Sequence, residues 1–413
     1  MRVFKLGRCF LLTISLVLLL LPISAFAKDT YEYHYNELNR LDRITKNNKP
    51  FFYFNYDANG QLTRKVSVMS MVSAGGDHTI GIKTDGTIWG WGGNTYGQLG
   101  NGLNKSSQLP IQTSTLADIE SIIAGYQYTV AINRKGELWS WGNNTYGQLG
   151  DGTTTKRLEP VQISILTGIK SVAAGKNHVV ALKSDGTLWA WGRNQNGQLG
   201  DGTTTDRISP VQINGITGVV SIAAGESHTV ALKNDGTVWT WGYNGYSQLG
   251  EGKARSIPAQ VNGITGVVSV AAGANHTVTL KKDGTVWAWG NNYQGQLGNG
   301  TQTRSAIPVQ ANGLGEVTTI VAGGDHTVAL KNNGTVWAWG TNYWGQLGDG
   351  TRTDHSSPAQ VKGLDEVESL VSGTSHIAVI KKDGTLWTWG SNSSGQLGND
   401  EYKGNSTTPI LVY

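Results

Sequence analysis

The segment AAGKNHVVALKSDGTLWAWG at residues 173–192 decides the fold, because it joins strands through turns of recognisable type. Apolar or alternating runs of strand length lie in and beside it, at Lys170–Ala174, His178–Lys183 and Thr187–Trp191. Asp185-Gly186 predicts a tight hairpin turn in which both central residues have positive φ. After a glycine-rich loop, Pro210–Ile213 predicts a fourth strand. This part of the chain therefore predicts a sheet of four strands.

The same unit occurs seven times along the chain. The second tryptophan of its Trp-x-Trp-Gly motif recurs at intervals of 50, 50, 50, 48, 50 and 50 residues. Because one copy is too small to bury a core of its own, the repeat predicts a stacked architecture. Seven copies of four strands predict an all-β fold, a seven-bladed β-propeller of four-stranded blades over residues 67–413, without helices. The sequence leaves open whether Pro409–Tyr413 completes the last blade or closes the ring against Ser67–Ser73.

Fourteen of the fifteen tryptophans belong to these motifs, and we expect them to pack the blades together. Residues i and i+2 of a strand point to one face, so both tryptophans of a pair lie on the same side of the sheet. The residue between them is small in every copy, which suits close packing against the next blade. The expected core tryptophans are Trp89, Trp91, Trp139, Trp141, Trp189, Trp191, Trp239, Trp241, Trp287, Trp289, Trp337, Trp339, Trp387 and Trp389.

Residues 1–27 have the three parts of a secretory signal peptide. A basic start precedes the apolar run Leu11–Leu21, and Ala25-Phe26-Ala27 supplies a cleavage site. Removal of this segment takes away three basic residues and the single cysteine, so the net charge falls from +4 to +1. We therefore expect a secreted extracellular or cell-envelope protein with no membrane span after cleavage. A near-neutral surface also argues against nucleic acid as a partner.

Residues 28–66 carry a short repeat of their own. Tyr33-His34-Tyr35-Asn36 and Phe54-Asn55-Tyr56-Asp57 lie 21 positions apart, and each precedes a turn. Alternating aromatic residues before such turns predict β-hairpins. The segment resembles the YD repeats of secreted bacterial Rhs-type and teneurin-like proteins. Two copies are too few for the shell that those proteins form, so we interpret the segment as an ordered remnant or a docking hairpin.

The larger repeat resembles the regulator-of-chromosome-condensation (RCC1) family of β-propellers, in a bacterial secreted form. The shared pattern joins Gly-x-x-His, Asp-Gly-Thr, Trp-x-Trp-Gly and Gly-Gln-Leu-Gly in one cycle. One branch of this family exchanges nucleotides on a small GTPase, using acidic and histidine side chains of the Gly-x-x-His turns and an inserted wedge. Asp77, Glu226 and Asp325 occupy such turns, but all seven copies keep the same spacing, so no wedge has been inserted. The ultraviolet-sensing branch has tryptophans in these turns, and this chain has none there.

A third activity implied by the resemblance is tight protein binding, as in a secreted β-lactamase inhibitor protein of this fold. That protein uses aromatic residues on one face. Here the Gly-x-x-His turns offer Tyr126 and Tyr128, while the long loops offer Tyr96, Tyr146, Tyr243, Tyr246, Tyr293, Tyr343 and Trp344. Aromatic residues near loop tips are enriched at binding hot spots. Our candidate binding residues are Tyr126, Tyr128, Asp77, Glu226, Asp325, Tyr246, Tyr343 and Trp344.

Six histidines occupy one position of the repeat: His78, His178, His228, His276, His326 and His376. A ring of histidines could suggest a metal, but ligands converge on one point, so we expect these side chains to hold turns by hydrogen bonds. The acidic loops have too few alternating carboxylates for an EF-hand-type calcium site. Motifs of hydrolases and phosphate loops do not occur, and no copy carries a polar group that the others lack. We therefore expect no catalytic residue, no metal and no cofactor.

The sequence thus predicts a secreted, monomeric, non-catalytic scaffold that presents propeller loops to a protein or cell-envelope ligand. An enzyme-inhibitor-like binder of the β-lactamase inhibitor type is the alternative. A purely structural envelope component, an exchange factor and a metal-dependent enzyme rank below these two hypotheses.

Overall fold

A computed structural model describes residues 30–46, 49–56, 60–113 and 116–412. The chain divides into two compact units, one of residues 1–68 with Tyr413 and the other of Met69–Val412. The predicted signal peptide lies outside the described residues. Within the described residues, no helix is long and apolar enough to cross a membrane.

The first unit contains an antiparallel sheet with the order β1-β2-β3-β4. Its strands are β1 (Tyr31–Tyr35), β2 (Leu41–Lys46), β3 (Lys49–Tyr56) and β4 (Leu62–Ser67). Asn39 and Gly60 have positive φ values of 57° and 83° after β1 and β3, which places left-handed residues at the two turns that the short repeat predicted. The Tyr56 hydroxyl group donates to the Leu41 carbonyl over 2.8 Å. The two aromatic repeats therefore belong to one continuous sheet.

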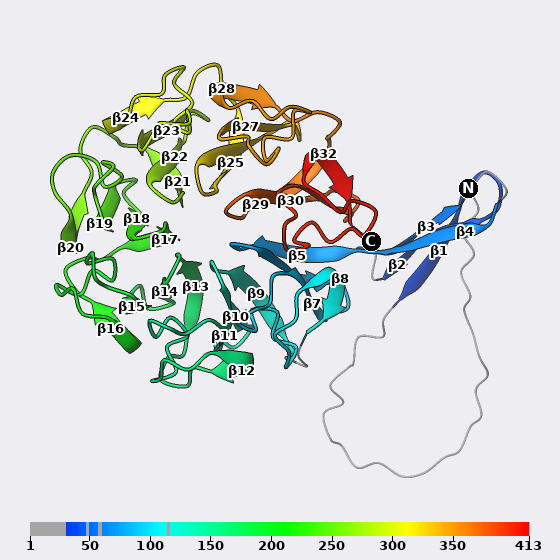
Figure 1. Ribbon diagram of the computed structural model, residues 1–413, viewed down its shortest axis with the longest axis horizontal. Coiled ribbons are helices and arrows are strands. Elements are labelled where there is room, and N and C mark those ends of the chain that lie inside the picture. Colours follow the sequence, from blue (N-terminus) through cyan, green and yellow to red (C-terminus); the bar gives the residue numbers. More distant parts are fainter. Residues whose placement is uncertain (1–29, 47–48, 57–59, 114–115, 413) are drawn as a thin grey trace, which may run out of the picture. The chain divides into compact units, whose positions relative to one another are not determined.

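The second unit is a seven-bladed β-propeller, as predicted (Figure 1). Blades 1 to 3 comprise β5 (Met69–Ala74), β6 (His78–Lys83), β7 (Ile88–Gly92), β8 (Ser107–Gln112); β9 (Ile119–Ala124), β10 (Tyr128–Asn133), β11 (Leu138–Gly142), β12 (Arg157–Gln162); and β13 (Ile169–Ala174), β14 (His178–Lys183), β15 (Leu188–Gly192), β16 (Arg207–Ile213). Blades 4 and 5 comprise β17 (Val219–Ala224), β18 (His228–Lys233), β19 (Val238–Gly242), β20 (Arg255–Gln260); and β21 (Val267–Ala272), β22 (His276–Lys281), β23 (Val286–Gly290), β24 (Ser305–Gln310). Blades 6 and 7 comprise β25 (Val317–Ala322), β26 (His326–Lys331), β27 (Val336–Gly340), β28 (His355–Gln360); and β29 (Val367–Ser372), β30 (His376–Lys381), β31 (Leu386–Gly390), β32 (Ser406–Leu411).

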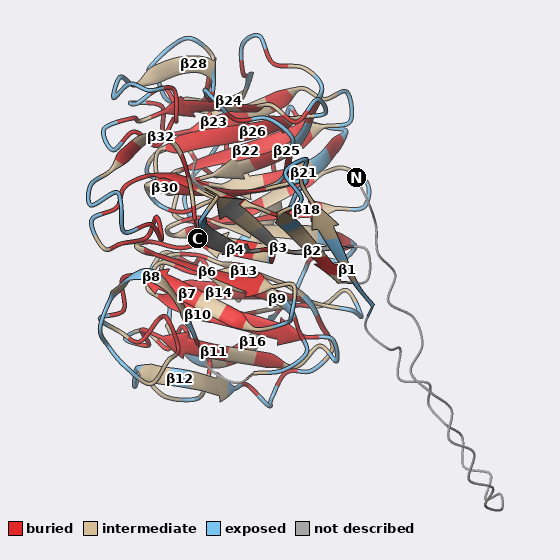
Figure 2. Cartoon of the chain, turned by 90° about the vertical axis from the view of Figure 1, so that its right-hand side faces the viewer, coloured by how far each residue is buried: buried red, intermediate tan, exposed pale blue. Residues whose placement is uncertain are grey.

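The first strand of each blade lies nearest the centre of the ring and the fourth lies outermost (Figure 1). The middle strands are buried, whereas outer strands such as β12 and β28 are only partly covered (Figure 2). Proline occurs in these outer strands because an edge strand can lose one backbone donor. Antiparallel order brings the Gly-x-x-His turns and the long loops between third and fourth strands to one end of the ring. We call this end the loop face; in blade 3 it comprises residues 175–177 and 193–206.

The Asp-Gly turns differ from the prediction. Only the glycine has positive φ, for example 83° at Gly186, and Asp185 does not. The Gly186 amide bonds to the Lys183 carbonyl, and the Lys183 amide bonds to the Thr187 carbonyl. Four residues therefore connect β14 to β15, because β15 begins at Leu188 and not at Thr187 as predicted. The Asp185 side chain accepts the Thr187 amide and hydroxyl hydrogens, which explains why aspartate suits this position without left-handed φ.

The tryptophan pairs pack as the alternation predicted, since both members of a pair contact the preceding blade. Trp141 and Trp139 join a cluster with Ile80 and Ile88 of blade 1. All seven second tryptophans are fully buried, and each indole nitrogen donates to a glutamine carbonyl of the preceding blade's long loop, as Trp141 does to Gln98 over 2.9 Å. The first tryptophans are half-buried, and in five copies a lysine ammonium lies over the ring. Each interface is therefore built from one blade's tryptophans and its neighbour's loop.

The ring closes without exchange of strands. β32 pairs with β31 inside blade 7, and β5 to β8 form blade 1 by themselves. Blade 7 is joined to blade 1 by side chains and turns alone, including a cluster of Met69 and Trp91 with Ile380 and Val412. The question that the sequence left open is thereby answered, because every blade consists of four consecutive strands.

Candidate functional site

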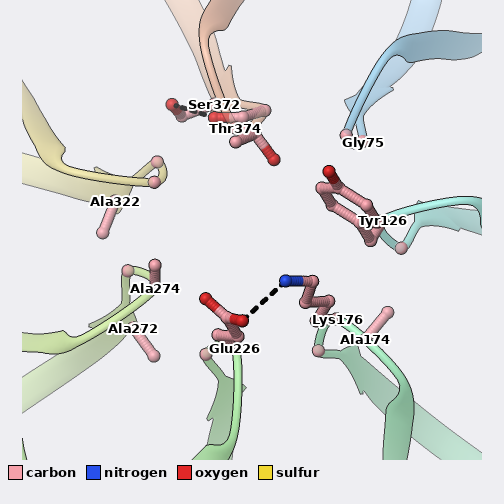
Figure 3. A pocket seen from close by; sticks show the side chains of 18 of the residues that line it. Gly75, Tyr126, Ala174, Lys176, Glu226, Ala272, Ala274, Ala322, Ser372 and Thr374 are labelled. Carbon is pink, nitrogen blue, oxygen red and sulfur yellow. Dashed lines mark hydrogen bonds and ion pairs between the residues drawn. The ribbon is translucent and has the colours of Figure 1, made fainter.

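The inner strands end at a central cavity of about 300 Å³ on the loop face (Figure 3). Each blade contributes the last residue of its inner strand and the first residues of its Gly-x-x-His turn. In blade 3 these residues are Ala174, Gly175 and Lys176. An added Cβ at Gly175 would lie 2.5 Å from Nδ1 of His178 and 2.6 Å from the Gly225 carbonyl oxygen, so glycine is required for this close approach.

Backbone hydrogen bonds between neighbouring turns surround the cavity. In every blade except blade 2, the amide of the first residue after the glycine donates to a carbonyl of the next blade, as Lys176 does to Gly225 and Ala274 to Gly324. The Thr374 amide closes the circle by donating to the Gly75 carbonyl over 3.0 Å. Because backbone groups of neighbouring blades hold one another, the mouth of the cavity is fixed before any ligand arrives.

One position of this mouth varies strongly between blades. Blades 2, 3 and 4 carry Tyr126, Lys176 and Glu226, while the other four carry Gly76, Ala274, Gly324 and Thr374. Nζ of Lys176 lies 2.6 Å from Oε1 of Glu226 and 5.3 Å from the ring centre of Tyr126 (Figure 3). We call Tyr126, Lys176 and Glu226 the polar arc. It corrects our expectation that no copy carries a distinct polar group, and a comparison of this one position across the copies could have found it.

The two other acidic candidates lie one residue further along their turns. Asp325 accepts hydrogen bonds from Nε2 of Gln296 over 2.9 Å and Nδ2 of Asn291 over 3.3 Å, so its carboxylate also holds the long loop of blade 5. Burial raises the pKa of Asp325 above its ordinary value, and the charge of Glu226 adds to this effect. Burial likewise raises the pKa of Asp77. The structure therefore brings Glu226 and Asp325 to one cavity, whereas Asp77 follows the lining residue Gly76 and does not itself line it.

The six repeated histidines connect adjacent blades. Nε2 of each ring lies 2.8–3.2 Å from a hydroxyl oxygen of the next blade. In five junctions the partner is threonine: Thr129, Thr229, Thr277, Thr327 and Thr79. Because these hydroxyl groups donate to the glutamine carbonyls of the long loops, they accept from the histidines. Each histidine is thus assigned as the tautomer with hydrogen on Nε2.

The other ring nitrogen of these histidines has no hydrogen-bond partner in the described part of the chain. All six rings are fully buried, and burial lowers the pKa of each to about 3 or 4. The rings are therefore neutral at physiological pH. Across the residues that the structure describes, no three His, Cys, Asp or Glu side chains lie close enough together to hold a metal ion.

Tyr128 must be withdrawn as a candidate binding residue. It replaces histidine in blade 2 and is fully buried, because its ring extends between blades 2 and 3. Its hydroxyl group donates to the carbonyls of Gly175 and His178 over 3.0 and 2.8 Å. The neighbouring blade has Val179 at the position where five blades have threonine. No threonine hydroxyl group is therefore left without a histidine partner there. Tyr128 therefore fastens two blades and offers no surface to a ligand.

The remaining aromatic candidates lie in the long loops of blades 4 to 6. The rings of Tyr243 and Tyr246 meet edge to face at 6.2 Å, and Tyr246 meets Tyr293 at 6.4 Å. Tyr343 and Trp344 form a second pair at 4.6 Å. Tyr293 and Tyr343 are 55% and 65% exposed, and Trp344 is 36% exposed. We call these five residues the aromatic patch, which is carried by three successive blades of the loop face.

The long loops are held together by a central asparagine. In blade 3, Nδ2 of Asn194 lies 3.1 Å from Oδ1 of Asp201 and from the carbonyls of Thr203 and Thr205. The side-chain oxygen of Asn194 accepts the Leu199 amide over 3.0 Å. An arginine, Arg207, pairs with the second oxygen of Asp201. The loop carboxylate that might have suggested a cation is thus satisfied by amide, hydroxyl and guanidinium groups.

Comparison with known proteins agrees with this geometry. A family model described as the RCC1-like domain matches residues 169–413, more than half of the chain. The chain belongs to this family. RCC1 repeat models also match residues 85–132, 135–182 and 119–148 of this RCC1-like protein. No family model that matches it describes a catalytic domain, and a search of curated proteins finds no match.

Several solved structures share its fold at low sequence identity. Human WBSCR16 is 23% identical with a TM-score of 0.71, over 79% of this chain and 94% of that one. Prp20p of Saccharomyces cerevisiae, which was described together with its binding to Gsp1p and histones, is 22% identical with a TM-score of 0.72, over 84% and 87%. The ectodomain of the Physcomitrella patens receptor kinase CR4 is 16% identical with a TM-score of 0.51, over 78% and 74%. These likenesses concern the fold alone.

Proposed function

We propose that this protein is a secreted, non-catalytic binding protein that holds a protein ligand on its loop face. The observation that carries this proposal is the aromatic patch, Tyr243, Tyr246, Tyr293, Tyr343 and Trp344. Large aromatic side chains lose little conformational entropy on binding and are enriched at interface hot spots. Their partial exposure in three adjacent blades gives a continuous part of the ring the composition of an interface.

The long loops do not need aromatic side chains in order to adopt their conformation. The backbone amides of Trp344 and Tyr246 donate to a glutamine side chain in their own loops, and the amides of Asn196 and Ser394 do the same elsewhere. A small polar residue therefore meets the structural need at this position. The aromatic identity of Trp344 is consequently best explained by contact with something outside the chain.

The loops beneath the patch are pre-organised. Each long loop is held by its central asparagine, such as Asn342 in blade 6, whose amide nitrogen contacts Asp349, Thr351 and Thr353. A rigid loop loses less entropy when a partner binds. Family relatives support a binding role, since Prp20p was described with its binding to Gsp1p and histones and was also solved with Kap60.

The proposed setting of this function is outside the cell or in its envelope. It rests on the signal-peptide pattern of residues 1–27 and on the small net charge that remains after its removal. We propose that the protein is a monomer in solution. Nucleic acid is not proposed as a ligand, because the mature chain has 30 basic and 29 acidic residues and so no excess of positive charge. The sheet of β1 to β4 is proposed to serve as an accessory docking segment.

The test is capture of partners by the immobilised mature protein, residues 28–413, from extracellular and cell-wall fractions of the source organism. The variant Tyr343→Thr/Trp344→Asn introduces residues that other copies use at these positions, so it is expected to fold. Ile257→Thr serves as a matched control, because Ile257 is 58% exposed but lies on the outer strand β20. A protein retained by the wild type and the control, and bound at least tenfold more weakly by the double variant, supports the proposal.

Equal retention by all three proteins, or retention by none, would overturn the assignment of the aromatic patch. The enzyme-inhibitor alternative is decided in the same experiment. In that case the retained protein is an enzyme, and its activity falls in proportion to the bound fraction. A binder of another kind leaves the activity of its partner unchanged.

A further inference from the structure

We propose that the mouth of the central cavity binds a small zwitterion of the amino-acid class, between Lys176 and Glu226 and against Tyr126. This site lies at the centre of the ring, whereas the aromatic patch lies in the long loops. The two assignments use different residues, so each can fail without the other.

The polar arc is not needed for folding. Its three residues occupy the position that is filled by Gly76, Ala274, Gly324 and Thr374 in the remaining blades. The amides of Lys176 and Glu226 donate to the next blade as those of the small residues do, so the backbone does not require their side chains. The Lys176–Glu226 pair is about one-third exposed on each side, and such a pair stabilises a fold by only about 0–1 kcal/mol. A role in ligand recognition accounts for three large polar side chains at this place.

The charges of the arc select the class of ligand. An anion bound to the ammonium group of Lys176 would lie beside Glu226 and near Asp325, and both would repel it. A cation bound to Glu226 would be repelled by the ammonium group of Lys176, whose Nζ already lies 2.6 Å from Oε1 of this carboxylate. A ligand with both charges can offer its carboxylate to Lys176 and its ammonium group to Glu226, so that no charge is left unmatched. A zwitterion is therefore the ligand that the ion pair accepts with the least repulsion.

Size and surroundings agree with a small ligand. A volume of about 300 Å³ is at the lower end for small-molecule pockets. Around the rest of the cavity the wall consists largely of small residues, among them Ala322 and Ala274 (Figure 3) as well as Gly324. These residues leave room for the body of the ligand and offer it apolar contact. The ring of Tyr126 faces the same space and already lies near the lysine ammonium group.

Asp325 favours one orientation of the ligand. Asp325 and Glu226 both line the cavity, and the charge of Glu226 adds to the effect of burial in raising the pKa of Asp325. The ammonium end of the ligand therefore belongs on the side of Glu226 and Asp325, in blades 4 and 6. The carboxylate end belongs on the side of Lys176 and Tyr126, in blades 3 and 2.

The test is calorimetric titration of the mature protein with each of the twenty common amino acids. The best binder is then compared with its two singly charged analogues, which for leucine are 4-methylpentanoate and 3-methylbutylamine. We expect one bound molecule per chain, and at least tenfold weaker binding of both analogues. The proposal is overturned if no amino acid binds at 10 mM, or if one analogue binds as well as the amino acid.

Substitutions assign the binding to the polar arc. Lys176→Ala and Glu226→Ala are expected to weaken binding at least tenfold and to fold, since alanine occupies this position in blade 5. Lys183→Ala removes a comparable Lys–Asp pair, with Asp185 at 3.0 Å, from the opposite end of the same blade and is expected to leave binding unchanged. Binding that survives both Lys176→Ala and Glu226→Ala would place the ligand elsewhere and overturn the proposal.

Discussion

Nε2 of His376 lies 2.9 Å from the hydroxyl oxygen of Thr79, and this bond joins the last blade to the first across 297 residues of sequence. The same hydroxyl group donates to the carbonyl of Gln396, so one threonine connects the second strand and the long loop of blade 7. The remaining junctions that use threonine repeat this arrangement between neighbouring copies. The junction that closes the ring therefore uses the same histidine–threonine hydrogen bond as four junctions between consecutive blades.

We expect Thr79→Val to lower the free energy of unfolding by about 1–3 kcal/mol. The substitution leaves the buried Nε2–H group of His376 without an acceptor, and removes the donor to Gln396. Urea unfolding followed by tryptophan fluorescence measures the loss. The double variant Thr79→Val/His376→Tyr recreates the arrangement of Tyr128 and Val179, and should recover most of the stability. Additive losses in the double variant would show that the two pairings are not interchangeable.

Stability should fall as the pH decreases from about 6.5 towards 4. The six buried histidines have a pKa of about 3 or 4 in the folded state, because burial disfavours the charged ring, against about 6.5 in the unfolded chain. Between these values the unfolded state binds more protons, so each histidine contributes a slope of up to about 1.4 kcal/mol per pH unit. Above pH 7 this contribution is constant.

The measurement for the histidines is the free energy of unfolding in urea between pH 4.5 and 8. Thr79→Val/His376→Tyr has one buried histidine fewer and should show a shallower slope than the wild type. An unchanged stability between pH 7 and pH 5 would contradict the neutral, buried state of these rings.

Asn194→Ala should cost about 2–4 kcal/mol of unfolding free energy. The substitution leaves Asp201 and two threonine carbonyls without the donor that they share, and removes the acceptor of the Leu199 amide. Asn244→Ala is the matched comparison in blade 4. The nitrogen of Asn244 makes one short contact, 2.8 Å to Gly252, because that loop is two residues shorter and lacks the aspartate. Thermal or urea unfolding should therefore show the smaller loss for Asn244→Ala, and the reverse order would refute this account.

Gly200→Ala and Gly186→Ala separate backbone strain from steric conflict. Both glycines have positive φ, 75° and 83°, so each substitution carries the strain of a left-handed alanine, about 1–2 kcal/mol. A Cβ at Gly200 would also lie 2.6 Å from the indole nitrogen of Trp241, whereas a Cβ at Gly186 meets nothing within 4 Å. We expect Gly200→Ala to be the more destabilising by at least about 2 kcal/mol, measured by urea unfolding. Equal losses would mean that the indole can move aside.

The propeller was predictable because its signals are local and repeated. The position of each strand follows from alternation, and the side on which Trp139 and Trp141 pack follows from the two-residue period of a strand. The Asp-Gly turns were wrongly assigned positive φ at both central residues, because the pattern does not report the φ of Asp185, whose side chain bonds to Thr187. The way in which the ring closes depends on contacts between the first and last copies. The sequence of a single strand does not indicate which distant strand it will contact.

The candidate site was harder to predict, because it is assembled from residues about fifty positions apart. Lys176 and Glu226 meet only because consecutive turns surround one axis, so neither residue is conspicuous within its own copy. Tyr128 was placed among the aromatic residues of the turns, although the equivalent histidines are also fully buried, because this burial is produced by packing against the next blade. The polar arc and Tyr128 are each found where copies differ from one another at the same repeat position. Such differences are not needed for the repeated fold.

Every sheet of the ring is formed by one uninterrupted stretch of chain, and this has a consequence for how such molecules change over time. The boundary between two copies in the sequence coincides with the boundary between two sheets in space. Duplication or loss of one segment therefore adds or removes a whole building block, and cuts no sheet in two. A circular permutant that begins at Val219, between blades 3 and 4, would likewise keep all seven sheets intact. The connectivity of this chain therefore allows the number of blades to change by whole repeats.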